Sequence, residues 1–147
     1  MRAAIKQAIV GATKYDEVPI GAVIVKDGKI IARAHNMKEE KKCANYHAEI
    51  VAIEKACKKI GDWRLIGCDM YVTLEPCPMC VGALINARID NIYFGAFDEK
   101  AGSLVSRCKL MEKKYNHYAH YEGGIMQEEC AKLLSDYFKA KRGKVWL

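Results

Sequence analysis

A chain of 147 residues with 51% hydrophobic and 29% charged residues fits one globular domain and excludes a disordered chain. The formal net charge of +6 suits a polyanionic partner, and a lysine-rich soluble surface accounts for it equally well. Seven cysteines without a secretory signal favour a reducing cytoplasm, and no apolar run approaches the length of a membrane span. We therefore expect residues 1–147 to form a single cytoplasmic domain.

The hydrophobic pattern predicts helices and strands that alternate along the chain. Apolar residues at helical spacing predict helices over residues 1–14, 47–60, 77–85, 104–113 and 127–141. Short apolar runs predict strands over residues 20–25, 29–34, 70–74, 89–94 and 118–121. Asp27-Gly28 is a hairpin signal between the first two strands, and the polar segment 35–46 predicts a loop. This order predicts an α/β fold whose mixed sheet carries helices on both faces.

Two of these helices carry predictions about burial. The second helix is expected to face the core with a stripe of larger apolar residues, Ile50, Ile53, Cys57 and Ile60. The third helix is apolar nearly all round, which predicts burial between other layers.

The chemistry is concentrated in two short motifs, His47-Ala48-Glu49 and Pro76-Cys77-Pro78-Met79-Cys80. Both fall where a helix begins, and the partial positive charge of a helix N-terminus favours the thiolate form that a metal needs. Two thiolates and one imidazole with an open fourth position describe a catalytic zinc site. Glu49 is not needed as a ligand and is therefore free to act as a general acid and base.

Such a site performs hydrolytic deamination. Zinc lowers the pKa of a bound water to about 7, and hydroxide can then add to the amino-bearing carbon of a nucleobase. Glu49 would move the protons, and ammonia would leave. Two other interpretations remain open. A structural zinc site would recruit a fourth ligand such as Cys43, Cys68 or His35, whereas a dithiol oxidoreductase would leave His47 and Glu49 unexplained.

At these residues the chain resembles the zinc-dependent cytidine deaminase-like superfamily, which has a His-x-Glu and Pro-Cys-x-x-Cys signature. The likeness extends to the branch that acts on tRNA adenosine, through the segments 17–23, 35–36, 63–65, 71–77, 94–96, 102–104, 116–117 and 128–138. The resemblance implies a three-layer α/β/α fold with a central five-stranded mixed sheet, and a homodimer. It also implies that the chain converts the wobble adenosine of a tRNA anticodon stem-loop to inosine.

The resemblance further assigns residue roles. His47, Cys77 and Cys80 would bind Zn²⁺, and Glu49 would shuttle protons. The remaining residues would contact the substrate: Asn36 and the backbone of Ala48 orient the base, Ile20 and Leu74 line its pocket, and Asp98 and Lys100 lie beside the nucleic acid strand. Tyr137, next to Phe138, could stack on a flanking base, and a core or dimer contact explains it equally well.

The chain departs from the family pattern before the zinc histidine and in one loop. Ala44-Asn45-Tyr46 stands where the tRNA enzymes usually carry Pro-Thr-Ala, and the loop Asp98–Ser103 is shorter than usual. This loop borders the polynucleotide in the family. The alternative function is therefore deamination of a free nucleobase or nucleoside of the guanine, cytosine or adenine type on the same fold.

Overall fold

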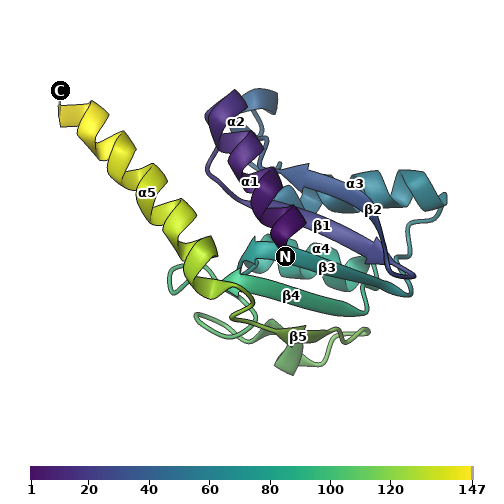
Figure 1. The fold of residues 1–147 in the computed structure, drawn as a ribbon. Helices are drawn as coiled ribbons and strands as arrows, with labels where there is room; N and C mark the ends of the chain where they lie inside the picture. Colours follow the sequence, from purple (N-terminus) through teal and green to yellow (C-terminus); the bar gives the residue numbers. More distant parts are fainter. Residues whose placement is uncertain (147) are drawn as a thin grey trace.

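The computed structural model describes residues 1–146, so Leu147, the last residue of the expected domain, lies outside the described chain. Helices and strands alternate along the sequence, and Figure 1 shows them grouped around one sheet. The elements are α1 (Arg2–Tyr15), β1 (Gly21–Lys26), β2 (Lys29–His35), α2 (Lys38–Lys41), α3 (Ala48–Ile60), β3 (Cys68–Leu74), α4 (Pro78–Asn86), β4 (Asn91–Ala96), the 3₁₀ helix η1 (Leu110–Lys113), β5 (His120–Glu122) and α5 (Gln127–Trp146).

The strands form one mixed sheet in the order β2-β1-β3-β4-β5. β1 pairs antiparallel with β2 and β3, whereas the β3–β4 and β4–β5 pairs are parallel. The expected hairpin at Asp27-Gly28 is confirmed, because these residues adopt positive φ angles of 51° and 74°, as a type I′ turn requires. The parallel pair β3–β4 needs a crossover, which α4 supplies.

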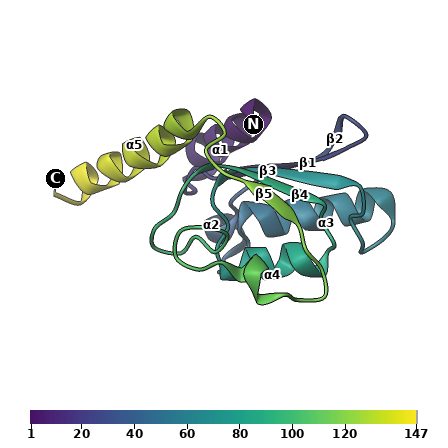
Figure 2. The same ribbon diagram turned by 90° about the horizontal axis from the view of Figure 1, so that it is seen from below.

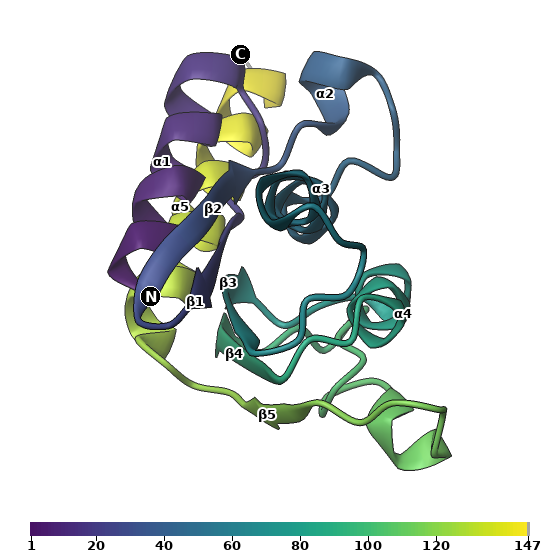
Figure 3. The same cartoon turned by 90° about the vertical axis from the view of Figure 1, so that its right-hand side faces the viewer.

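Helices cover both faces of the sheet, which confirms the expected three-layer α/β/α fold. Figures 2 and 3 show α1 and α5 on one face and α3 and α4 on the other. Gly21 allows α1 to lie close against β1, since a Cβ atom at position 21 would stand 1.9 Å from the carbonyl oxygen of Ala4. The C-terminal half of α5 projects beyond the sheet (Figure 1).

The inner face of α3 differs from the prediction. Its buried apolar residues are Ala48, Val51, Ala52 and Ala56. The predicted stripe of Ile50, Ile53, Cys57 and Ile60 is only half-buried. Alanine methyl groups let the helix pack closely on the sheet, and the larger side chains then lie along its flanks. A pattern that weights residues by hydrophobicity favours isoleucine over alanine, and for this reason the predicted stripe lies at the edge of the buried face, where Ile53, Cys57 and Ile60 still pack against the core.

Two connections also differ from the prediction. The segment 35–46 contains the short helix α2, whose Glu39 and Glu40 amides donate hydrogen bonds to the buried Glu17 carboxylate at 3.2 and 2.7 Å. The helix expected over residues 104–113 is wrong for most of its length, because only η1 is helical. Contacts with distant carboxylates fix both segments, and hydrophobic periodicity does not record such contacts.

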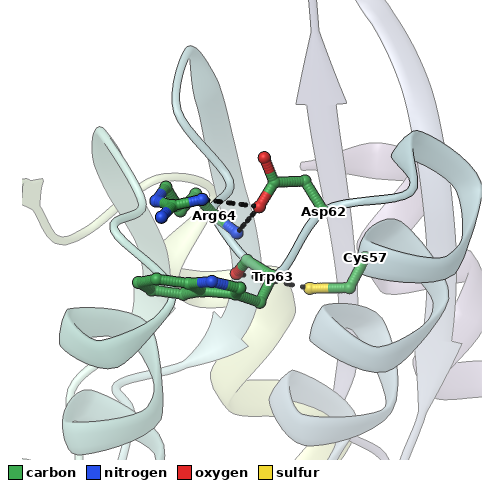
Figure 4. A network of polar contacts seen from close by, with 4 residues as sticks. All are labelled: Cys57, Asp62, Trp63 and Arg64. Carbon is green, nitrogen blue, oxygen red and sulfur yellow. Dashed lines mark hydrogen bonds and ion pairs between the residues drawn. The ribbon is translucent and has the colours of Figure 1, made fainter.

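A compact polar network closes the connection between α3 and β3. In Figure 4, the Asp62 carboxylate accepts hydrogen bonds from the backbone and guanidinium of Arg64, and the Cys57 thiol reaches the Trp63 carbonyl. The guanidinium carbon of Arg64 lies 4.3 Å from the centre of the Trp63 ring. This network lies at the C-terminal end of α3, whereas the predicted site residues His47 and Glu49 lie at its N-terminal end.

Within residues 1–146, none of the helices combines the length and the apolar character that crossing a membrane demands.

Candidate functional site

The N-termini of α3 and α4 carry the side chains of the two motifs. His47 is the N-cap residue of α3 and Cys77 that of α4, and both have extended backbone conformations. Pro78 occupies the first turn of α4, where its missing N–H is not needed. Neither N-cap side chain makes a capping hydrogen bond, so the His47 ring and the Cys77 thiol can take part in the contacts of the cluster.

These side chains meet at one point. The Nδ1 atom of His47 lies 3.6 Å from the Sγ atoms of both Cys77 and Cys80. The three donor atoms all lie within 4.8 Å of one another, and Cys80 is fully buried. Soft sulfur and imidazole donors this close together could hold one metal ion.

The proton equilibria of the cluster are shifted together. Hydrogen bonding with Cys80 lowers the pKa of Cys77 to about 4, with a further contribution from His47. The same contact with Cys77 raises the pKa of Cys80, and burial adds to this effect. The hydrogen bond to Cys77 also raises the pKa of His47. The cluster therefore favours a thiolate, which is the form of cysteine that binds a metal ion.

Glu49 lies in the first turn of α3 with only 4% of its surface exposed. Burial raises its pKa to about 7, although hydrogen bonds and the nearby His47 partly oppose that effect. A carboxyl group with this pKa can both accept and release a proton near neutrality, which is the property of a general acid and base.

A cavity of ≈ 200 Å³ opens beside the cluster. Its walls come from several separate segments of the chain: Val18, Ile20, Asn36, Lys38, His47, Glu49, Leu74, Glu75, Cys77, Asp98 and Ala101. The Asn36 side chain is fixed in the wall, because its Oδ1 atom accepts a hydrogen bond from the Ala48 amide at 2.8 Å. A small cavity with apolar walls and a few fixed polar groups suits a flat, hydrogen-bonding ligand.

The structure brings most of the predicted site residues to this cavity. Those that line it are His47, Glu49, Cys77, Asn36, Ile20, Leu74 and Asp98. Ala48 contributes its amide to Asn36, and Cys80 is buried within the cluster. Lys100 lines an adjoining groove of ≈ 410 Å³ that shares Ile20, Leu74 and Asp98 with the cavity.

Tyr137 is placed away from this site. Its hydroxyl donates to the Asp16 carbonyl at 3.1 Å, and its ring lines a separate groove between α1 and α5. Phe138 instead lines the groove beside the cavity. Consecutive helical residues point about 100° apart, so the two neighbours face different surfaces. Tyr137 therefore lies outside the cavity, and its stacking on a flanking base stays a prediction.

Four lining residues were not predicted: Val18, Lys38, Glu75 and Ala101. The least expected is Glu75, which is 2% exposed and immediately precedes Pro76 and Cys77. Its pKa is lowered: burial raises it, but hydrogen bonds from Ser106 and backbone amides outweigh that effect. Its place beside the Cys-x-x-Cys motif was the available signal, but its partners lie about thirty residues further along the chain.

Known proteins resemble this chain in sequence over nearly its whole length. Residues 1–142, which include the entire cavity, match the model of the MafB19-like deaminase family. A relative from Bacillus subtilis (strain 168) is 48% identical over 145 residues, which is 98% of this chain and 89% of the relative. A relative from Aquifex aeolicus (strain VF5) is 44% identical over 135 residues, 91% of this chain and 89% of the relative. Both are named tRNA-specific adenosine deaminase.

Solved structures also resemble the fold of this chain. A structure from studies of A-to-I editing by tRNA:A34 deaminases has a TM-score of 0.86 and 42% identity, and the match covers 91% of this chain and 97% of the other. The X-ray structure of guanine deaminase from Bacillus subtilis has a TM-score of 0.66 and 32% identity, and the match covers 97% and 90% of the two chains.

Proposed function

Because this chain belongs to the MafB19-like deaminase family, we propose that it hydrolyses adenosine to inosine at the wobble position of a tRNA anticodon. The observation that carries the proposal is the buried Glu49 beside the His47, Cys77 and Cys80 donors at one cavity. The substrate class is supported by the full-length relatives named tRNA-specific adenosine deaminase.

The proposed cofactor is zinc, held by His47, Cys77 and Cys80. Zn–S distances of about 2.3 Å and Zn–N distances of about 2.0–2.1 Å in a tetrahedron separate nitrogen and sulfur donors by about 3.5 Å. The two nitrogen–sulfur distances of 3.6 Å agree with that separation. Three ligands leave one position for a water, as in catalytic zinc sites.

The residues of the chain then divide the reaction between them. Zinc, when bound, would make a water nucleophilic at neutral pH. Glu49 would accept one proton from the attacking water and deliver it to the purine ring nitrogen. It would then take the remaining proton of the added hydroxyl group, as the carbonyl forms, and pass it to the departing amino group. Its pKa of about 7 suits both directions of transfer. Since the carbon that carried NH₂ ends as a carbonyl, adenosine becomes inosine and ammonia is released.

The cavity walls orient the base. Asn36 and the Ala48 amide form a fixed polar edge, while Ile20 and Leu74 supply apolar contacts for the ring. Asp98 and Lys100 flank the opening and would lie along the nucleic acid strand. A base can reach this cavity only if it is splayed out of its stack, as in the recognition of single-stranded RNA loops.

A second candidate is deamination of a free base. The observation that favours it is the 32% identity to guanine deaminase from Bacillus subtilis over 97% of this chain. A ≈ 200 Å³ cavity also accommodates a free purine. The higher identities of 48% and 44% to the tRNA-specific enzymes place this candidate second.

Ammonia release by the zinc-loaded protein separates the two candidates. An anticodon stem-loop with adenosine at the wobble position is compared with guanine, cytosine, adenine and their nucleosides. We expect turnover of the stem-loop that falls steeply with added salt, because phosphate contacts release counterions. Turnover of free guanine without the stem-loop would instead assign the second function.

We also propose that the working form is a homodimer in the cytoplasm. One face of α4 packs into the core, whereas its apolar residues Met79, Gly82 and Ala83 stay half-exposed, so the helix is not buried between layers within the described residues. A second copy covering this face would complete its burial. The seven cysteines are free thiols, as a reducing compartment favours. Light scattering during gel filtration tests the mass, and an Ala83→Arg variant should be monomeric.

A further inference from the structure

The segment from Asp98 to Ser106, here called the rim loop, is fastened to the end of β3 by one buried carboxylate. Glu75 is 2% exposed and accepts five hydrogen bonds from this loop. Its Oε2 atom accepts from the amides of Leu104, Val105 and Ser106 at 3.2, 2.8 and 2.9 Å, and its Oε1 atom accepts from the Asp98 amide at 3.1 Å and from the Ser106 hydroxyl.

The loop backbone rests directly on this carboxylate. A Cβ atom at Gly102 would stand 2.3 Å from the Glu75 Cδ atom and 2.5 Å from the Asp98 carbonyl oxygen, so the position requires glycine. Asp98 tightens the start of the loop, because its Oδ1 atom accepts from the amides of Lys100 and Ala101 at 3.0 and 3.3 Å. Hydrogen bonds to an ionised acceptor are roughly twice as strong as neutral ones, and the rim loop is accordingly held in one position.

Glu75 also joins the loop to the metal-ligand motif. It precedes Pro76 and Cys77 directly, and the Pro76 carbonyl accepts a hydrogen bond from the Ser103 amide at 2.9 Å. On the other side, Asp98 and Ala101 of the rim loop form part of the cavity wall. One residue therefore fixes the distance between the wall that faces the ligand and the cluster that performs the chemistry.

We infer that Glu75 is a positioning residue that sets the rim loop against the substrate base and so determines how tightly substrate binds. The inference rests on the proposed function, because it takes an RNA-borne purine as the ligand. Glu75 acts on the substrate only through the loop, because both of its carboxylate oxygens already accept hydrogen bonds from the loop. The loop it holds contributes to binding, whereas Glu49 and the cluster contribute to the chemical step.

The decisive variant is Glu75→Gln. Either orientation of an amide turns an NH₂ group toward two or three N–H and O–H donors, so the hydrogen bonds are lost without a change in side-chain size. We expect the KM for the stem-loop to rise about tenfold while kcat changes less than about threefold, with one zinc per chain retained. Amide hydrogen exchange at Leu104, Val105 and Ser106 should become at least about tenfold faster. Glu112→Gln, the same change at an exposed site in η1, is the matched control.

A fall in kcat at unchanged KM, a loss of zinc, or unchanged amide exchange would each overturn the assignment. Ser106→Ala removes one of the five hydrogen bonds and keeps the test decisive if Glu75→Gln does not fold. Its KM should rise about two- to threefold with kcat unaltered. Amide exchange needs no substrate, so it judges the loop assignment even if the wild-type protein deaminates a free base and not the stem-loop.

Discussion

Glu49 and Glu75 line the same cavity and are both almost fully buried, yet their pKa values are shifted in opposite directions. Burial dominates at Glu49 and raises its pKa to about 7. At Glu75 burial acts in the same sense, but hydrogen bonds from Ser106 and the loop amides reverse the net effect. The direction of each pKa shift is therefore set by the balance between desolvation and the hydrogen bonds that the carboxyl group accepts.

This difference separates a group that moves protons from one that holds structure. Glu49 has few competing donors and stays close to the cluster, so its proton affinity is poised for transfer. At Glu75 the hydrogen-bond donors of the loop favour the charged form of the carboxyl group. The same hydrogen bonds hold the nine residues of the loop from Asp98 to Ser106 in place. Glu17 also holds structure, since it accepts hydrogen bonds from the amides of Glu39 and Glu40 and so anchors α2, whose Lys38 lines the cavity.

Replacement of Glu49 by glutamine should have the largest effect on catalysis. The variant keeps the shape of the side chain but cannot accept the proton of the attacking water. We expect kcat to fall by about 10²–10⁴ while zinc content and thermal stability are retained. Single-turnover kinetics and metal analysis of the same preparation measure both. A kcat within a factor of ten of wild type would contradict the role of Glu49 in proton transfer.

The sequence was sufficient to predict that Glu49 and its three neighbours meet, although the two pairs lie 30 residues apart. Each pair is a short motif of side chains with distinctive chemistry, and each begins a helix. Glu75 and Glu17 were missed because their partners are mainly backbone amides, which every residue but proline carries and which form no motif. The same limit explains the wrong helix over residues 104–113, where amides that periodicity assigned to a helix bind Glu75 instead.

The fold was predictable for a similar reason. The individual strands and the first hairpin followed from apolar runs and the Asp27-Gly28 turn, which are local signals. The five-stranded sheet and its three layers were expected from the family resemblance. The orientation of side chains on helices was less predictable. Mainly alanines form the buried face of α3. Tyr137 and Phe138 point in different directions from α5, and only Phe138 lines the groove beside the cavity. Both outcomes depend on how closely neighbouring elements approach, which a single sequence does not specify.

Gly102→Ala tests how Glu75 holds the rim loop, and we expect a moderate effect. The added methyl group would collide with the Glu75 carboxylate and the Asp98 carbonyl. Overpacking of this kind costs about 1–3 kcal/mol of unfolding free energy, and the displaced rim loop should also raise KM. Urea denaturation with stem-loop kinetics measures both, and Gly143→Ala, at an exposed position with no atom within 4 Å of the new methyl group, is the control for stability alone. Equal stability of the two variants would show that the loop adjusts freely.

The smallest effect, and the sharpest test of the opposite pKa shifts, lies in the pH dependence of stability after the metal has been removed. The folded-state pKa of Glu49 is raised from 4.5 to about 7, so its neutral form is favoured and its contribution is lost as pH rises from about 5 to 8. Glu75 has a lowered pKa, so its contribution is present above its unfolded pKa and is lost as pH falls into the acid range. Relative to wild type, Glu49→Gln should therefore gain stability toward pH 8, whereas Glu75→Gln should be destabilised most near neutrality and least in acid. Urea titrations of the two variants at a series of pH values measure these differences, and parallel curves would mean that both carboxyl groups experience the same environment.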